Sequence, residues 1–201
     1  MFKKVFLVGS IAILTMGYTQ AQANFGVRAG LNLTNMKFSS GGSSYTPEDM
    51  KPGFQAGIVG ELGTKSFVIQ PGILFAQQGY KQDGWTTTLN YIQIPVNAIY
   101  KVNLGVAKLL LQAGPYLGYG ISGKAKNSDG ESQKVTLGSG EGDFVKPIDF
   151  GLGVGAGVQF GAIQAGIGYN FGLANLSKVE EGDAKITNNG WAITLTCLFG
   201  K

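Results

Sequence analysis

The chain reads Asp149-Phe150-Gly151-Leu152-Gly153-Val154-Gly155-Ala156-Gly157-Val158-Gln159-Phe160, in which every second residue is apolar and the others are small or polar. Side chains alternate across a β-strand, so this period of two predicts a strand with two unlike faces. The stretch is about as long as the ~9–11 residues that a tilted strand needs to cross a membrane. We therefore expect its apolar residues to face lipid and its glycines to face a crowded barrel interior.

Seven more segments repeat the alternation, and none of comparable length has a helical period. They cover residues 24–33, 54–62, 67–76, 91–102, 109–120, 163–171 and 191–199. Long connections near 35–52, 77–88, 123–147 and 173–189 alternate with short ones near 63–66, 103–107 and 161–162. This is the pattern of a transmembrane barrel, which must close because an open sheet edge leaves unpaired backbone groups in lipid. The prediction is an all-β fold: one eight-stranded antiparallel up-and-down transmembrane β-barrel.

Three prolines fall within the expected strands. Pro71, Pro95 and Pro115 each lack the backbone N–H that a ladder hydrogen bond needs. We expect local bulges at these positions.

The first residues predict export. Lys3 and Lys4 precede an apolar run over residues 5–16, and Ala21 and Ala23 then form an Ala-x-Ala cleavage site. The apolar run is too short for a membrane anchor, and no cysteine follows it to mark a lipoprotein. We expect residues 1–23 to be a signal peptide and residues 24–201 to form an outer-membrane barrel domain that starts at Asn24.

The composition narrows the function. Charged residues make up 14% of the chain, against about 25% in soluble domains, and there are 33 glycines. Cleavage removes two lysines and lowers the net charge from +4 to about +2, which argues against a nucleic-acid partner. Cys197 is the single cysteine, so no intrachain disulfide can form, and we expect it to be an inert thiol facing lipid.

A glycine motif and the absence of histidine bear on cofactors and catalysis. Gly118-x-Gly120-x-x-Gly123 matches a dinucleotide fingerprint, but the loop-like run 124–130 follows it where a helix would be needed. We therefore expect no cofactor. Barrel hydrolases generally use a histidine base, and the chain has none. The sequence thus favours a protein that is not an enzyme.

Several stretches resemble the PorT-like outer-membrane β-barrel family across nearly all of the mature chain. They are residues 25–32, 70–75, 89–96, 113–116 and 149–152, of which Tyr91-x-x-x-Pro95 and Ala113-Gly114-Pro115-Tyr116 are the most specific. The resemblance implies an outer-membrane barrel of eight strands. It carries no catalytic or ligand residues, because the family is defined by its fold.

Charged residues on inward faces are few. Arg28, Glu61 and Asp149 are the three that stand out. Arg28 lies low on an ascending first strand and Glu61 low on a descending second one, so we expect these two to pair in the lumen, since a buried unpaired charge is costly. Four lysines near the short turns suggest solubilising and snorkelling roles, with contact to anionic lipid as the alternative. They are Lys65, Lys101, Lys108 and Lys201.

The longest loop mixes both signs of charge. Its acids are Asp129, Glu131, Glu141 and Asp143, and its lysines are Lys124, Lys126, Lys134 and Lys146. Carboxylate oxygens suit a divalent cation, but the spacing matches no known calcium loop. A solvated loop without metal is the favoured interpretation, and lipopolysaccharide phosphates on the lysines are an alternative.

Four functions remain open at this point. The leading one is a structural or interaction protein of the outer membrane with a packed, non-conducting lumen, surrounded by lipid and bound to an unknown protein through its long loops. The second is a small channel or transporter, and the third is an enzyme acting on lipid or peptide. The fourth is a soluble lipocalin-like barrel with an apolar ligand inside, which would require the faces to be inverted.

We predict that the mature protein begins at Asn24. The intact mass of protein purified from membranes should equal that of residues 24–201. A mass that still includes Met1 to Ala23 would contradict the proposed cleavage site.

Overall fold

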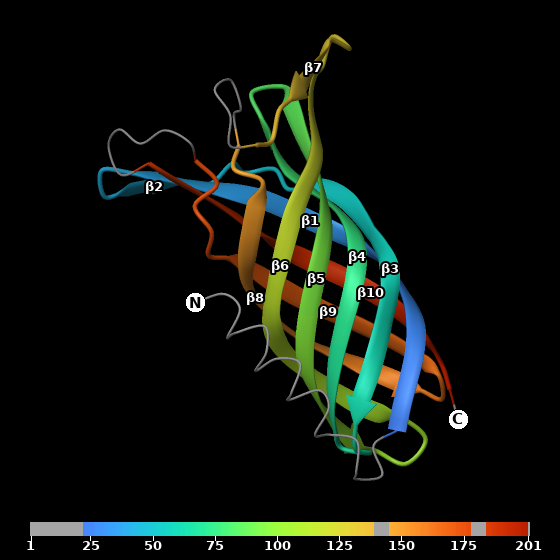
Figure 1. The fold of residues 1–201 in the computed structure, drawn as a ribbon. Coiled ribbons are helices and arrows are strands. Elements are labelled where there is room, and N and C mark those ends of the chain that lie inside the picture. Colours follow the sequence, from blue (N-terminus) through green and yellow to red (C-terminus); the bar gives the residue numbers. More distant parts are fainter. Residues whose placement is uncertain (1–21, 139–144, 178–183, 201) are drawn as a thin grey trace, which may run out of the picture.

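Eight long strands form a closed ring in the computed structural model, which describes residues 22–138, 145–177 and 184–200. The ring strands are β1 (Gln22–Ser40), β3 (Lys51–Gly63), β4 (Phe67–Gln82), β5 (Trp85–Asn103), β6 (Lys108–Asn127), β8 (Ile148–Phe160), β9 (Ile163–Gly172) and β10 (Lys185–Phe199). Two short strands, β2 (Ser43–Tyr45) and β7 (Ser132–Val135), pair with β1 and β6. The strands run around the barrel in chain order, as Figure 1 shows.

The ring closes between the first and last strands. β1 pairs with β10 in antiparallel register, from Phe25 opposite Phe199 to Ser39 opposite Lys185. All other neighbours in the ring are antiparallel as well. The predicted eight-stranded antiparallel barrel is therefore confirmed.

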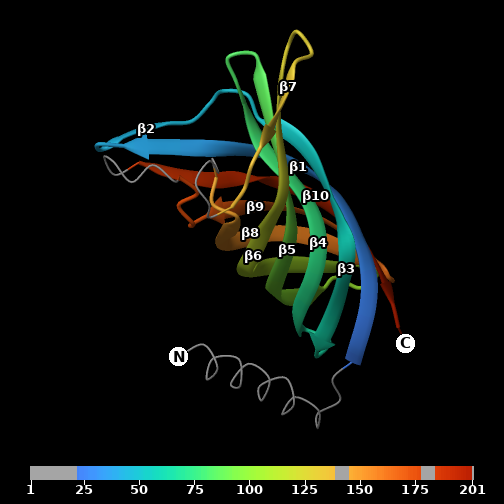
Figure 2. The same cartoon turned by 45° about the horizontal axis from the view of Figure 1, so that its top comes forward.

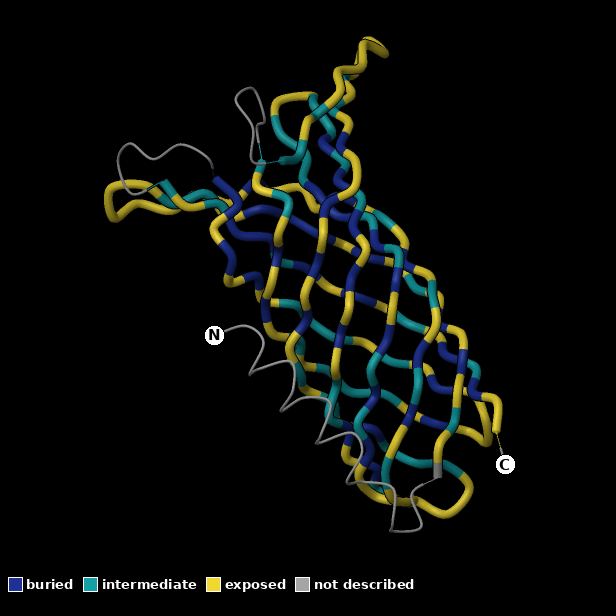
Figure 3. The backbone as a smooth tube through the Cα atoms, viewed as in Figure 1, coloured by how far each residue is buried: buried dark blue, intermediate teal, exposed yellow. Residues whose placement is uncertain are grey.

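The two faces of the wall lie as the alternation predicts. Buried and exposed residues alternate along the strands (Figure 3), and the outward positions Val154 and Ile167 are 47% and 49% exposed. The bulky side chains at inward positions of β4, β5 and β6 are buried: Leu74, Tyr91, Ile99, Leu110 and Tyr116. A soluble barrel with an apolar interior is thereby ruled out, because the apolar face is on the outside. No helix within the described ranges is long and apolar enough to cross a membrane.

The strands run further than their alternation suggested. Beyond the last partners in β3 and β9, β1 and β10 continue together as an arm that carries β2. The outer parts of β4, β5 and β6 continue likewise with β7, and both extensions project from the barrel in Figure 2. The stretch 77–88, expected as a loop, is thus the end of a hairpin. Its turn is Asp83-Gly84, with φ values of 49° and 75°, which suit the tight turn that Asp-Gly favours between paired strands.

The expected bulges at the prolines are wrong. Pro71 lies opposite Val96, Pro95 opposite Tyr116 and Pro115 opposite Leu152, and the register is the same on both sides of each. A missing N–H removes one ladder bond without inserting a residue. The register shift between β5 and β6 lies elsewhere, because Tyr91 pairs with Gly120 but Asn90 with Ser122, which leaves Ile121 extra.

The inward glycines receive bulky side chains from adjacent strands. Gly151 is the register partner of Tyr116, and a Cβ at Gly151 would lie 2.7 Å from Tyr116 Cε1. Likewise, a Cβ at Gly155 would lie 2.9 Å from Nε2 of Gln112, again its register partner. The contacts that the structure shows run between neighbours in the sheet.

The expected cleavage site lies at the start of β1. The strand begins at Gln22, where Gln22 and Ala23 pair with Gly63 and Leu62. Residues 1–21, including Ala21, lie outside the described part of the chain. Cleavage before Asn24 stays a prediction, and it would shorten β1 by these two residues.

We predict that Val154→Arg or Ile167→Arg lowers the free energy of unfolding in lipid by about 2–4 kcal/mol, the cost of a cation near the bilayer midplane. Val154→Leu is the matched control, since it keeps an apolar side chain at the same outward position. The measurement is urea unfolding in lipid vesicles. Unchanged stability of Val154→Arg would show that this face does not meet hydrocarbon.

Candidate functional site

Polar side chains fill the lumen near the short turns, in a group that we call the lower network. It takes one residue from each ring strand except β6: Arg28, Glu61, Gln70, Lys101, Gln159, Gln164 and Thr196. Every member is buried. Because each residue stands at an inward position, the alternation of the strands brings them together across the barrel.

Glu61 lies at the centre of the lower network and is fully buried, with 0% exposure. Its Oε2 accepts a hydrogen bond from the ammonium Nζ of Lys101 at 2.7 Å, which is an ion pair. Its Oε1 accepts from Nε2 of Gln164 at 2.7 Å and from Nε2 of Gln70 at 3.0 Å. The Lys101 ammonium also donates to Gln159 Oε1 at 3.2 Å. Both oxygens of the buried carboxylate thus have donors, which is the condition for burying such a charge.

Arg28 joins the same network without touching Glu61. Its Nε donates to Thr196 Oγ1 at 2.9 Å, and its Nη2 donates to Gln70 Oε1. Since Nε2 of Gln70 donates to Glu61, one amide stands between the guanidinium and the carboxylate. The expected direct pair of Arg28 and Glu61 is therefore corrected. Both residues lie in the lumen, but Lys101 is the partner of Glu61.

The role of Lys101 was missed because it lies close to a short turn, where lysines commonly reach solvent. The sequence did indicate that Lys101 faces inward. It is an even number of residues from Tyr91, Gln93 and Ile99, so all four lie on the same, inward face of β5. Lys101 is 7% exposed. Because Glu61 is an acid on the inward face of β3, the inward position of Lys101 on β5 should have suggested this lysine as its cation.

Asp149 lies apart from the lower network, at the start of β8. Its Oδ2 accepts hydrogen bonds from Tyr116 Oη at 3.4 Å and from Asn188 Nδ2 at 3.3 Å. Asn188 Nδ2 also donates to Gln78 Oε1. Among the described residues, Oδ1 of Asp149 has no hydrogen-bond partner. This group places a second buried acid in the lumen, and its contacts there are neutral.

Apolar side chains close the long-loop end of the barrel, in a group that we call the outer cap. Its buried members are Met36, Leu89, Tyr91, Ala174 and Leu176. Partly buried residues pack on them, among them Tyr80 of β4 and Leu137, which follows β7. A Cβ at the inward Gly120 would lie 2.7 Å from Leu137 Cδ2, so the packing reaches into the mouth of the barrel.

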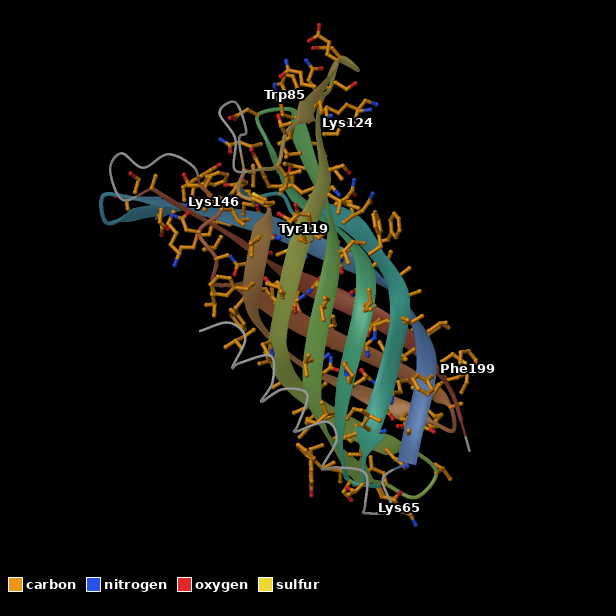
Figure 4. All side chains as sticks on the ribbon, viewed as in Figure 1. Lys65, Trp85, Tyr119, Lys124, Lys146 and Phe199 are labelled. Atoms are coloured by element: carbon orange, nitrogen blue, oxygen red, sulfur yellow. The ribbon has the colours of Figure 1, made fainter. Side chains whose placement is uncertain are left out.

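The charged side chains outside the lumen lie at both ends of the molecule. Lys65 stands at the short-turn end, and Lys124 and Lys146 stand at the loop end (Figure 4). Lys124 is the register partner of Lys134 across β6 and β7. The acids Glu141 and Asp143, like Lys201, lie outside the described residues. No group of three or more metal-binding side chains occurs in the described ranges.

A family model described as outer membrane protein beta-barrel domain matches residues 19–178. A comparison with curated proteins finds no match.

The solved structures that are similar to this chain include three barrels of low sequence identity. Neisserial surface protein A has 19% identity and a TM-score of 0.48, over 88% of this chain and 99% of that one. Ail, the attachment invasion locus protein of Yersinia pestis, solved in complex with the heparin analogue sucrose octasulfate, has 14% identity and a TM-score of 0.45, over 89% and 99%. The N-terminal β-barrel domain of OprF from Pseudomonas aeruginosa has 13% identity and a TM-score of 0.36, over 87% and 99%.

We predict strong coupling between Glu61 and Lys101. Lys101→Met alone should cost about 3–5 kcal/mol of stability, because it leaves a buried carboxylate without its cation. Adding Glu61→Gln should recover much of that loss. Unfolding free energies of both single variants and the double variant give the coupling, and strictly additive effects would contradict the ion pair.

A double-mutant cycle on Arg28 and Glu61, measured in the same way, serves as the control. Because Gln70 stands between them, their coupling should be smaller than that of Glu61 and Lys101. A larger coupling energy would mean that Arg28 and Glu61 contact each other directly in the lumen of the membrane-embedded protein.

Proposed function

Since the chain belongs to the family of outer membrane protein beta-barrel domains and lies in the cell outer membrane, we propose that it is a non-catalytic structural or interaction protein there. Its lumen stays closed, and its projecting hairpins make the contacts. The resemblance of residues 89–96 and 113–116 to PorT-like barrels is part of the same proposal. The observation that carries it is the closure of the barrel at two levels.

The lower network and the outer cap support a closed lumen. An eight-stranded barrel has an interior just wide enough for side chains to fill. Here seven strands send polar side chains to one level, where hydrogen bonds link them, and apolar residues pack at the other end. A cavity of about 50 Å³ remains between them, room for a few waters at most. A channel would require both closures to move.

The projecting hairpins support a role in binding. The β4–β5 and β6–β7 hairpins and the β1–β10 arm lie past the ring, at the end where outer-membrane barrels carry their extracellular loops. Their hydrogen-bonded ladders hold them in shape, so a partner would meet a preformed surface. Trp85 and Lys124 lie on two of these hairpins (Figure 4). Protein partners and lipopolysaccharide phosphates are both compatible with such a surface.

We predict that the purified protein in a planar bilayer shows no stable conductance steps, because the lower network and the outer cap block the axis. The matched measurement is the variant Lys101→Met with Glu61→Gln, which removes the ion pair but keeps the volume of the side chains. It should stay closed as well. Reproducible steps from the unaltered protein would overturn the closed lumen and favour a channel.

The binding role is tested by photo-crosslinking in intact outer membranes. A photoreactive residue at Ser128, at the tip between β6 and β7, should give discrete adducts. The same residue at the exposed Lys65 is the control at the short-turn end. Adducts at neither site, or at Lys65 alone, would contradict contacts through the hairpins.

A further inference from the structure

The buried charges of the lumen do not pair off completely. Lys101 and Glu61 form the single ion pair found among the described residues. Arg28 is 8% exposed, and its hydrogen bonds to Thr196 and Gln70 go to a hydroxyl and an amide, both neutral. The carboxylate of Asp149 accepts hydrogen bonds from Tyr116 and Asn188, which are both neutral. Glu61 attracts the Arg28 guanidinium across Gln70, but the same carboxylate is in direct contact with Lys101. One acid thus faces two cations, and Arg28 is the one that has no anion in direct contact.

Arg28 also lines the cavity of about 50 Å³ in the middle of the lumen. The polar side chains around it are Gln55, Gln93, Asn97, Gln112, Tyr116, Asn170 and Thr194, of which Tyr116 has its hydroxyl on Asp149. Amide NH₂ groups and hydroxyls can turn hydrogen-bond donors toward a ligand. Neither Glu61 nor Asp149 lines the cavity, so Arg28 brings the only formal charge to a wall made entirely of described residues.

We propose that this cavity is a binding site for one small monovalent inorganic anion of the size of chloride. The guanidinium of Arg28 supplies the charge, and the surrounding amides and Thr194 supply donors. One water needs about 10–15 Å³ of such space, so the cavity has room for a halide with a little water. One positive charge balances a monovalent ion, whereas a dianion would leave buried negative charge in excess.

Water alone would satisfy the donors but would not balance Arg28. The strands around the cavity supply no carboxylate to its wall. Glu61 is reached from Arg28 only through Gln70, and Asp149 lies behind the hydroxyl of Tyr116. The site is separate from the hairpins on which the proposed binding function rests. It would persist even if the protein had no partner.

The first experiment is anomalous diffraction from crystals grown in sodium bromide. We expect a bromide peak in the cavity beside Arg28. Peaks confined to surface lysines, or none at all, would overturn the site.

The second experiment compares thermal unfolding in lipid vesicles in sodium chloride and in sodium gluconate of equal ionic strength. Gluconate is too large for the cavity, so we expect the midpoint to be a few degrees higher in chloride. Arg28→Gln should abolish the difference, and Thr194→Val, which keeps the shape but loses the hydroxyl, should reduce it. The double variant Lys101→Met with Glu61→Gln is the control and should keep the difference, because neither residue lines the cavity.

Two outcomes of this experiment would contradict the anion site. One is an equal midpoint in both salts, which would mean that water alone fills the cavity. The other is a difference that survives in Arg28→Gln, which would mean a general effect of chloride on the protein or the lipid.

Discussion

The pairing of every backbone N–H and C=O within the bilayer is the constraint on which this structure depends. Hydrocarbon offers no hydrogen-bond partner, so the first and last strands must meet. β1 and β10 meet over a long register, from Phe25 opposite Phe199 to Ser39 opposite Lys185. The ladder therefore continues past the membrane, and the same hydrogen bonds that close the ring also build the projecting arm.

Closure with eight strands then sets the interior. The space inside is narrow, and side chains must fill it. On the β6 and β8 side, Tyr116 lies against Gly151 and Gln112 against Gly155. A Cβ at Gly151 would also collide with the backbone oxygen of Phe171, and one at Gly155 would lie 2.7 Å from that of Ile167, so packing requires glycine at both positions. The narrow interior of an eight-stranded barrel thus accounts for glycine at these two positions.

The fold could be predicted from the sequence because one face of each strand consists almost entirely of apolar residues. A period of two carries that information residue by residue, and it placed Val154, Ile167 and Tyr91 on the correct faces. The cation that pairs with Glu61 could not be predicted in the same way. Whether Arg28 or Lys101 meets Glu61 depends on the stagger between strands and on the reach of each side chain. The ends of the hairpins were also missed, because past the membrane the alternation of apolar and polar residues no longer holds, and only the turn Asp83-Gly84 marked one of them.

Glutamine is what allows a narrow lumen to hold separated charges. Its amide accepts at one atom and donates at another, so it can contact a cation and an anion together. Gln70 does this between Arg28 and Glu61. Gln164 extends the chain, donating to Glu61 and also to Gln159, which in turn accepts from Lys101. Charges on different strands are thereby linked without having to touch, so the interior can be polar and closed at once. An arginine whose hydrogen bonds go to an amide and a hydroxyl is well oriented but keeps its charge, and that is why the proposed anion site lies in its cavity rather than at the ion pair.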